Sequence, residues 1–112
     1  MARGRGSAAL AAAPVFAALG DATRLRLVSR MCTGGPQSIA DLTAGAGVTR
    51  QAVTKHLLVL AEAGLVRDAR SGRERRWTLE PARLEEARRA LDVISQQWDR
   101  TLERLRALVE RD

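Results

Sequence analysis

Four polar side chains lie close together in the stretch VTRQAVTKHLLVL, which covers residues 48–60. They are Arg50, Gln51, Thr54 and Lys55, and none of them carries a negative charge. Arginine can donate two hydrogen bonds to guanine, glutamine can pair with adenine in the same bidentate way, and threonine and lysine reach bases or phosphates. These residue types therefore favour contact with nucleic acid, and a solvated helix face is the alternative interpretation.

The other side of the same stretch is apolar at helical spacing. Val53, Leu57 and Leu60 recur at i, i+4 and i+7, which predicts a helix that buries one face. Thr49 is a suitable N-cap, and Gly64 follows the expected end of the helix. The polar residues would then share the exposed face.

A shorter predicted helix precedes this one. Ser38 caps it, Ile39 and Leu42 turn inward, and the AGAG of residues 44–47 ends it. Two helices joined by a glycine-bearing linker form the helix-turn-helix pattern. In that arrangement the second helix enters the major groove of DNA with its N-terminal residues against the base edges.

A basic hairpin is predicted after the helix pair. LVRDA at residues 65–69 and RRWTL at residues 75–79 are the candidate strands, and Gly72 supplies the turn in the connector RSGRE. The segment carries five arginines, which are Arg67, Arg70, Arg73, Arg75 and Arg76. Such a hairpin suits a wing that lies along phosphates or in the minor groove. Two adjacent basic elements favour DNA binding over the solvated helix face.

Two further helices are predicted upstream. The first covers residues 8–19 and follows a flexible basic arm at residues 1–7. The second has Asp21 as its N-cap, and its apolar face is expected to carry Leu25, Val28 and Cys32. A lone cysteine at an apolar helical position favours a small core residue for Cys32, with a redox switch as the alternative.

A long last helix begins at Pro81 and is predicted to extend to about Val109. Its apolar residues recur in steps of three and four, and they are Leu84, Ala87, Leu91, Ile94, Trp98, Leu102, Leu105 and Val109. A small domain cannot cover a stripe of this length, so part of it should pair with a second chain. The alternative is a helix that folds back onto its own domain. We divide the chain into the arm, a DNA-binding domain of residues 8–80 and a dimerisation helix of residues 81–112 in the same compact domain.

The net charge also favours a polyanionic partner. Nineteen basic and thirteen acidic side chains give a net charge of +6, with a sequence pI near 11.3. The excess lies before the last helix, because residues 80–112 carry seven basic and eight acidic side chains. The single cysteine excludes an intrachain disulfide and a Cys-rich zinc site.

The N-terminal sequence has some features of a targeting signal. The alanine-rich run after Arg3 and Arg5 imitates a secretory signal peptide, but Pro14 interrupts it and it continues directly into the next predicted helix. No stretch reaches the roughly 18–20 apolar residues that a membrane span requires. We therefore expect a cytoplasmic protein with no membrane partner.

Several short motifs occur in order between Val15 and Glu80. They are DATR at residues 21–24, AVTKHL at residues 52–57, EAGLV at residues 62–66 and GR at residues 72–73. In this order and spacing the segment resembles the ArsR-type (arsenic-repressor-like) winged helix-turn-helix regulators. The resemblance implies five helices and a two-stranded wing, with the first and last helices forming a dimer interface. It also implies a homodimeric bacterial repressor that binds a palindromic double-stranded DNA operator.

Three sets of candidate residues follow from the residue chemistry and the resemblance together. The recognition-helix set is Thr49, Arg50, Gln51, Thr54, Lys55 and His56, in which His56 is given a packing or DNA-backbone role. The wing set, expected to contact phosphates, is Arg67, Arg70, Arg73, Arg75 and Arg76. The dimer-interface set is Phe16, Leu91, Ile94, Trp98, Leu102 and Leu105.

Two departures separate this chain from the metal-sensing members of that family. Those members carry a C-x-C thiolate motif before an Asp-Leu pair, and here Ser38 and Ala40 occupy the two cysteine positions. Neither residue type is a soft-metal ligand. A second family site uses histidine and carboxylates of the last helix, and residues 81–112 contain no histidine. We therefore expect no metal and no cofactor, and any other effector stays open.

The sequence thus predicts a mainly helical winged helix-turn-helix protein with a small β-hairpin, which works as a homodimeric transcriptional repressor. An enzyme is not expected, because there is one histidine and no tyrosine, and no hydrolase motif surrounds the serines and aspartates. Two alternatives remain. One is a sequence-indifferent architectural DNA binder, and the other is a protein–protein adaptor that uses the winged fold without DNA.

Overall fold

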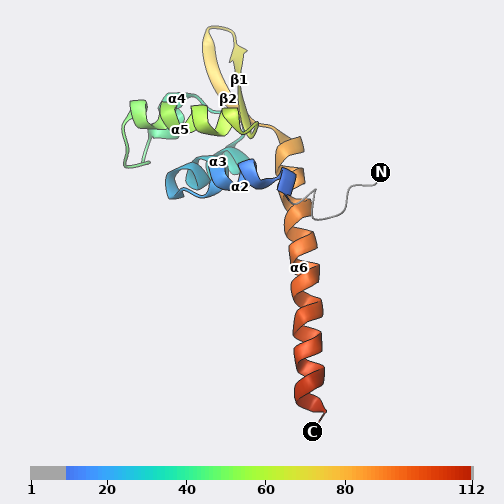
Figure 1. Cartoon of the computed structure of the whole chain (residues 1–112). Helices are drawn as coiled ribbons and strands as arrows, with labels where there is room; N and C mark the ends of the chain where they lie inside the picture. The colour runs from blue at the N-terminus through green and yellow to red at the C-terminus, as the bar shows by residue number, and fades with distance from the viewer. Residues whose placement is uncertain (1–9, 112) are drawn as a thin grey trace.

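The computed structural model describes residues 10–111. Six of its helices and strands precede the long last helix (Figure 1). The elements are α2 (Ala13–Leu19), α3 (Ala22–Gly34), α4 (Ile39–Thr43), α5 (Arg50–Glu62), β1 (Val66–Ser71), β2 (Glu74–Leu79) and α6 (Pro81–Glu110). The predicted fold class, mainly helical with one hairpin, is confirmed. The basic arm and the first two residues of the predicted first helix lie outside the described residues.

The core lies where α2, α3, α4 and α5 meet the base of the hairpin. The apolar face predicted for α5 is confirmed, because Val53, Leu57 and Leu60 are fully buried. Leu42 of α4 and Leu65, just before β1, are equally buried. The exposed face of α5 is therefore held in a fixed orientation by a packed opposite face.

The face predicted for α3 is confirmed at Val28 and wrong at Leu25 and Cys32. Leu25 is 53% exposed and Cys32 is also exposed, whereas Leu27, Val28 and Met31 are buried. The helix offers apolar residues on two overlapping sides, and packing against α2, α5 and β2 selects the side that carries Leu27 and Met31. Cys32 is therefore a surface residue and not a small core residue.

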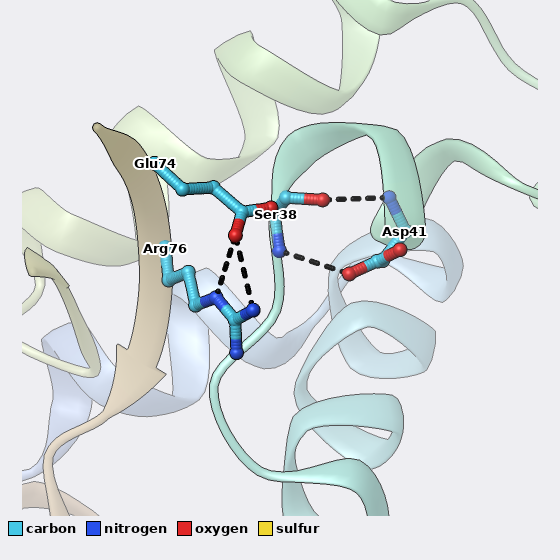
Figure 2. Close-up of polar contacts among 4 residues, drawn as sticks. All are labelled: Ser38, Asp41, Glu74 and Arg76. Carbon is cyan, nitrogen blue, oxygen red and sulfur yellow. Dashed lines mark hydrogen bonds and ion pairs between the residues drawn. The ribbon is translucent and has the colours of Figure 1, made fainter. Parts of the chain in front are cut away.

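Side-chain caps fix where the three central helices begin. The Asp21 carboxylate accepts a hydrogen bond from the backbone N–H of Arg24 at 3.0 Å, as predicted for the start of α3. Ser38 and Asp41 form a capping box at α4, with distances of 3.1 Å and 3.4 Å (Figure 2). Thr49 accepts from the backbone N–H of Ala52 at 3.1 Å, which fixes the first turn of α5.

The hairpin is longer and its turn tighter than predicted. The strands pair antiparallel in the register Val66↔Leu79 to Ser71↔Glu74, and only Gly72 and Arg73 lie between them. Gly72 has a φ of 66°, which favours glycine. The backbone of Gln37 pairs with Trp77 on the other edge of β2, through hydrogen bonds of 3.0 Å and 2.8 Å. The buried Trp77 side chain anchors the hairpin to the core.

The last helix leaves the rest of the molecule soon after it begins. It contains 30 residues and is about 45 Å long. Ala87 and Ala90 are buried near its start, and no residue of α6 after Ala90 is buried. Figure 1 shows the free end of α6 pointing away from the helical body, on the side opposite the hairpin. The radius of gyration is consequently 18.5 Å, against about 13 Å for a compact chain of this length.

No helix in residues 10–111 is long and apolar enough to cross a membrane.

Candidate nucleic-acid interface

The first half of α5 presents an unpaired polar surface. Arg50, Gln51 and Lys55 are exposed, and within residues 10–111 their side chains have no hydrogen-bond or ion-pair partner. Together with Thr54 they line an open hollow of about 520 Å³. The surface combines donors of several geometries with positive charge, and it contains no carboxylate, so it can approach the edges of base pairs and the phosphates beside them.

The two threonines of the recognition-helix set are already engaged in the fold. The Thr49 hydroxyl oxygen accepts from Ala52, and the Thr54 hydroxyl donates to the carbonyl oxygen of Arg50 at 2.9 Å. The Thr49 hydroxyl can still donate to an external group, and the Thr54 hydroxyl can still accept from one. The structure therefore makes Arg50, Gln51 and Lys55 the residues of the set that are fully free for contact.

His56 points to the body of the protein. Its Nδ1 atom lies 3.3 Å from a guanidinium nitrogen of Arg24 and 3.8 Å from a carboxylate oxygen of Asp21. Arg24 also donates from Nε to the carbonyl oxygen of Ala18 at 2.6 Å, so this cluster ties α2, α3 and α5 together. The hydrogen bond from the Arg24 backbone N–H lowers the pKa of the Asp21 carboxyl, and the charges of Arg24 and His56 lower it further. Of the two roles proposed for His56, the contacts favour packing.

No role was predicted for Arg30, which ties α3 to the C-terminal end of α4. Its guanidinium donates to the carbonyl oxygens of Leu42 and Ala44, at 3.1 Å and 2.6 Å. These carbonyls lie at the end of α4, where the helix leaves them without backbone partners. The side-chain amide of Gln37 donates to the carbonyl oxygen of Arg30 at 2.8 Å. The only sequence signal for this role is a basic residue on α3, which by itself does not identify an acceptor.

Carboxylates hold three of the five wing arginines. Arg67 forms an ion pair with Glu80 at the base of the hairpin. Arg76 donates from Nε and Nη2 to Glu74, at 3.2 Å and 3.0 Å, beside the start of α4 (Figure 2). Arg75 donates from Nε to Asp68 at 2.8 Å.

The strand register explains the pairing of Arg75 with Asp68. Arg70 and Arg75 lie directly opposite each other, where two like charges destabilise a hairpin. Asp68 lies on the same face of the hairpin, opposite Trp77, and offsets this repulsion. The Arg75 guanidinium also lies 5.0 Å from the centroid of the Trp77 ring. Arg70 and Arg73 are exposed, and no described residue pairs with either guanidinium.

The dimer-interface set lies mainly on the projecting part of α6. Leu91, Ile94, Trp98, Leu102 and Leu105 are between 38% and 58% exposed. Leu108 and Val109 extend the same apolar surface toward the C-terminus. Neither was in the predicted dimer-interface set, although Val109 was in the predicted apolar stripe. Phe16 differs from the others because it is half-buried against its own core. We call the apolar surface from Leu91 to Val109 the α6 stripe.

Ser38 and Ala40 stand where the metal-sensing relatives carry their two cysteines. The Ser38 hydroxyl forms part of the α4 capping box, and Ala40 lies on the surface. Among residues 10–111, no three side chains of histidine, cysteine, aspartate or glutamate come together as a metal site would require.

Similarity to known proteins decides the family. Residues 19–69 match the family of helix-turn-helix domains. Over 85 residues the chain is 39% identical to the HTH-type transcriptional regulator Rv2034 of Mycobacterium tuberculosis, and the alignment covers 76% of each chain. A solved ArsR-like transcriptional regulator from Rhodococcus sp. RHA1 is 36% identical, with 92% of this chain and 96% of that chain covered and a TM-score of 0.73. The chain belongs to the ArsR-type winged helix-turn-helix regulators.

This ArsR-type chain is accordingly a DNA-binding transcriptional regulator. Its fold is also that of a solution structure from Mycobacterium bovis, described as the homodimeric winged helix-turn-helix DNA-binding domain of a possible ArsR-family regulator. The two chains are 22% identical, the alignment covers 92% of this chain and 93% of the Mycobacterium bovis chain, and the TM-score is 0.61.

Proposed function

We propose that this ArsR-type chain represses transcription as a homodimer that binds an operator of twofold symmetry. The N-terminal half of α5 lies in the major groove and reads bases, and the wing contacts the backbone. One observation carries the proposal: Arg50, Gln51 and Lys55 are exposed, without a partner in residues 10–111, on a helix whose opposite face is fully buried. A helix held so rigidly presents its polar side chains at fixed positions, as base reading requires.

The dimer part of the proposal rests on the α6 stripe. Monomeric soluble proteins rarely expose a contiguous apolar surface of this extent, and a helix that projects without tertiary contacts is marginal in water. Pairing two copies of α6 around a twofold axis covers both stripes at once. The Mycobacterium bovis domain that shares this fold is described as homodimeric. Two α5 helices related by the same axis would then face two half-sites of the operator.

The contacts sharpen the roles of individual residues. Base reading falls to Arg50, Gln51 and Lys55, with the free capacities of Thr49 and Thr54 as supplementary contacts. Arg70 and Arg73 bind phosphates directly, because no carboxylate in the described part of the chain pairs with either of them.

Gln51 gives the most direct test, because replacing a neutral residue changes no charge. An operator is first selected from a pool of random duplexes, and Gln51→Ala is then titrated against this operator and against random DNA at several salt concentrations. We expect a loss of about 1–3 kcal/mol on the operator, far less on random DNA, and an unchanged slope of log affinity against log salt. Arg70→Ala should instead weaken both DNAs equally and lower the salt slope by about one.

The rival functions give different results in the same titrations. Equal weakening of both DNAs by Gln51→Ala would contradict base reading and favour an architectural binder. Weak and salt-insensitive binding of every DNA by the parent protein would favour a protein–protein adaptor.

We also infer that DNA binding and dimerisation need no metal and include no catalytic step. The positions of the family's thiolates hold Ser38 and Ala40, and the Ser38 hydroxyl is used in the capping box. A chelator should leave the operator affinity and the sedimentation of the dimer unchanged. Loss of operator binding in chelator would show that a metal site exists. Binding to a bacterial operator would place the protein in the cytoplasm.

A further inference from the structure

A hollow of about 340 Å³ lies between the start of α4, the start of α5 and the tip of the wing. Arg50 lines it from α5, Arg73 and Arg75 line it from the hairpin, and Ser38 lines it from the α4 side. Arg50 is distant in sequence from Arg73 and Arg75, and the fold brings it to the same hollow. Arg50 lines both this hollow and the hollow on the α5 surface, so its side chain lies on the side of α5 that faces the wing.

The charge of this hollow is unbalanced. Glu74 is the only carboxylate among its lining residues, and both hydrogen bonds that its carboxylate accepts come from Arg76 (Figure 2). Arg50 and Arg73 have no carboxylate partner among the described residues. The lining therefore carries three positive charges against one negative charge, which favours an anion.

Arg75 is held in a way that suits a bound anion. Its Nε donates to Asp68 at 2.8 Å and its guanidinium lies over Trp77, so the side chain is fixed from two sides. Both terminal nitrogens of the guanidinium remain available, because only Nε is used. A guanidinium with a fixed orientation loses little conformational entropy when it binds a phosphate oxygen.

We propose that this hollow binds one phosphate of the DNA backbone, and that Arg50 of α5 and Arg73 of the wing act on that same phosphate, with Arg75 behind them. This inference rests on the proposed function and changes one role in it: Arg50 binds this phosphate, and base reading falls to Gln51 and Lys55. Asp68 is then a positioning residue, because it orients Arg75. The shared phosphate joins the recognition helix to the wing, so that the two elements do not bind the backbone independently.

A double substitution distinguishes one shared phosphate from two separate ones. The salt slope counts neutralised phosphates, so Arg50→Gln with Arg73→Gln should lower it by at most about one. Arg70→Gln alone is the reference, because Arg70 does not line the hollow and should neutralise a phosphate of its own. This variant should lower the slope by about one, whereas separate phosphates for Arg50 and Arg73 would make the double variant lower it by about two. Each variant is titrated as the full chain against random-sequence duplex DNA, with circular dichroism as the check of folding.

Failure of this inference is separable from failure of the proposed function. If the double Arg50 and Arg73 variant loses about twice the slope that Arg70→Gln loses, the two arginines bind different phosphates and the shared site is wrong. If the parent protein binds neither random nor selected duplexes, the proposed function is wrong, and the shared phosphate with it. Arg89→Gln on α6 removes one charge far from the hollow and should leave the slope unchanged.

Discussion

The helices α5 and α6 are both amphipathic, and they expose opposite faces. In α5 the apolar face is completely buried within the chain, and Arg50, Gln51 and Lys55 of the polar face have no side-chain partner among the described residues. In α6 the apolar stripe from Leu91 to Val109 is exposed, although the same side of the helix is buried at Ala87 and Ala90. The exposed face of each helix indicates the class of partner that completes it. A charged polyanion suits α5, and a second apolar surface suits α6.

The largest effect should come from the α6 stripe. Trp98→Ala removes a large side chain that the dimer would bury, at a cost of roughly 3–5 kcal/mol. This loss weakens dimerisation by about two to three orders of magnitude. Light scattering across a dilution series measures the change in the dissociation constant. A variant that remains dimeric at the same dilutions would mean that Trp98 lies outside the interface, and the comparison of the two helices would fail for α6.

The buried face of α5 should govern stability of the monomer fold. Leu57→Ala is expected to lower the free energy of unfolding by about 2–5 kcal/mol, because Leu57 is fully buried in the core. Leu58→Ala is the matched control on the next residue, which is 54% exposed, and its effect should stay within about 0.5 kcal/mol. Both are measured by urea unfolding at one protein concentration, because dimerisation contributes to apparent stability. Equal losses for the two variants would indicate that another surface covers Leu58.

The α5 helix could be predicted from the sequence because its signals are local. The spacing of Val53, Leu57 and Leu60 and the Thr49 cap require no knowledge of the rest of the fold. The face of α3 could not be predicted in the same way. Its apolar residues fit two overlapping stripes, and only the packing of α2, α5 and β2 against it decides that Leu27 is buried and Leu25 exposed.

The ion pairs of the candidate site, like the buried face of α3, could not be predicted from local spacing. The arginines of the wing were evident from composition, but their partners depend on strand register and on the position of α6. A turn of two residues places Asp68 on the face of Arg75, and the return of the chain after β2 brings Glu80 to Arg67. Neither contact follows from spacing, because the predicted strands were shorter and their register was not known.

A smaller effect on stability is expected from Asp21, which caps the N-terminus of α3. The pKa of Asp21 is lowered from its ordinary value of 3.8, chiefly by the hydrogen bond from the Arg24 backbone N–H. Since the folded pKa lies below the unfolded one, the stabilisation is fully present above the unfolded pKa. It is lost as the pH falls through the folded pKa. Asp21→Asn can still cap the helix but does not titrate. Its urea midpoint should therefore fall less than that of the parent protein between pH 5 and pH 3, and parallel curves would contradict this assignment.

If the exposed face of each helix selects its partner, two single substitutions should have different effects on the dimer. Leu102→Glu places a carboxylate on the α6 stripe, and Lys55→Glu places one on the polar face of α5. Sedimentation velocity at the same protein concentration, without DNA, should show the Leu102 variant as a folded monomer and the Lys55 variant as an unchanged dimer. A dimeric Leu102 variant, or a monomeric Lys55 variant, would contradict the account.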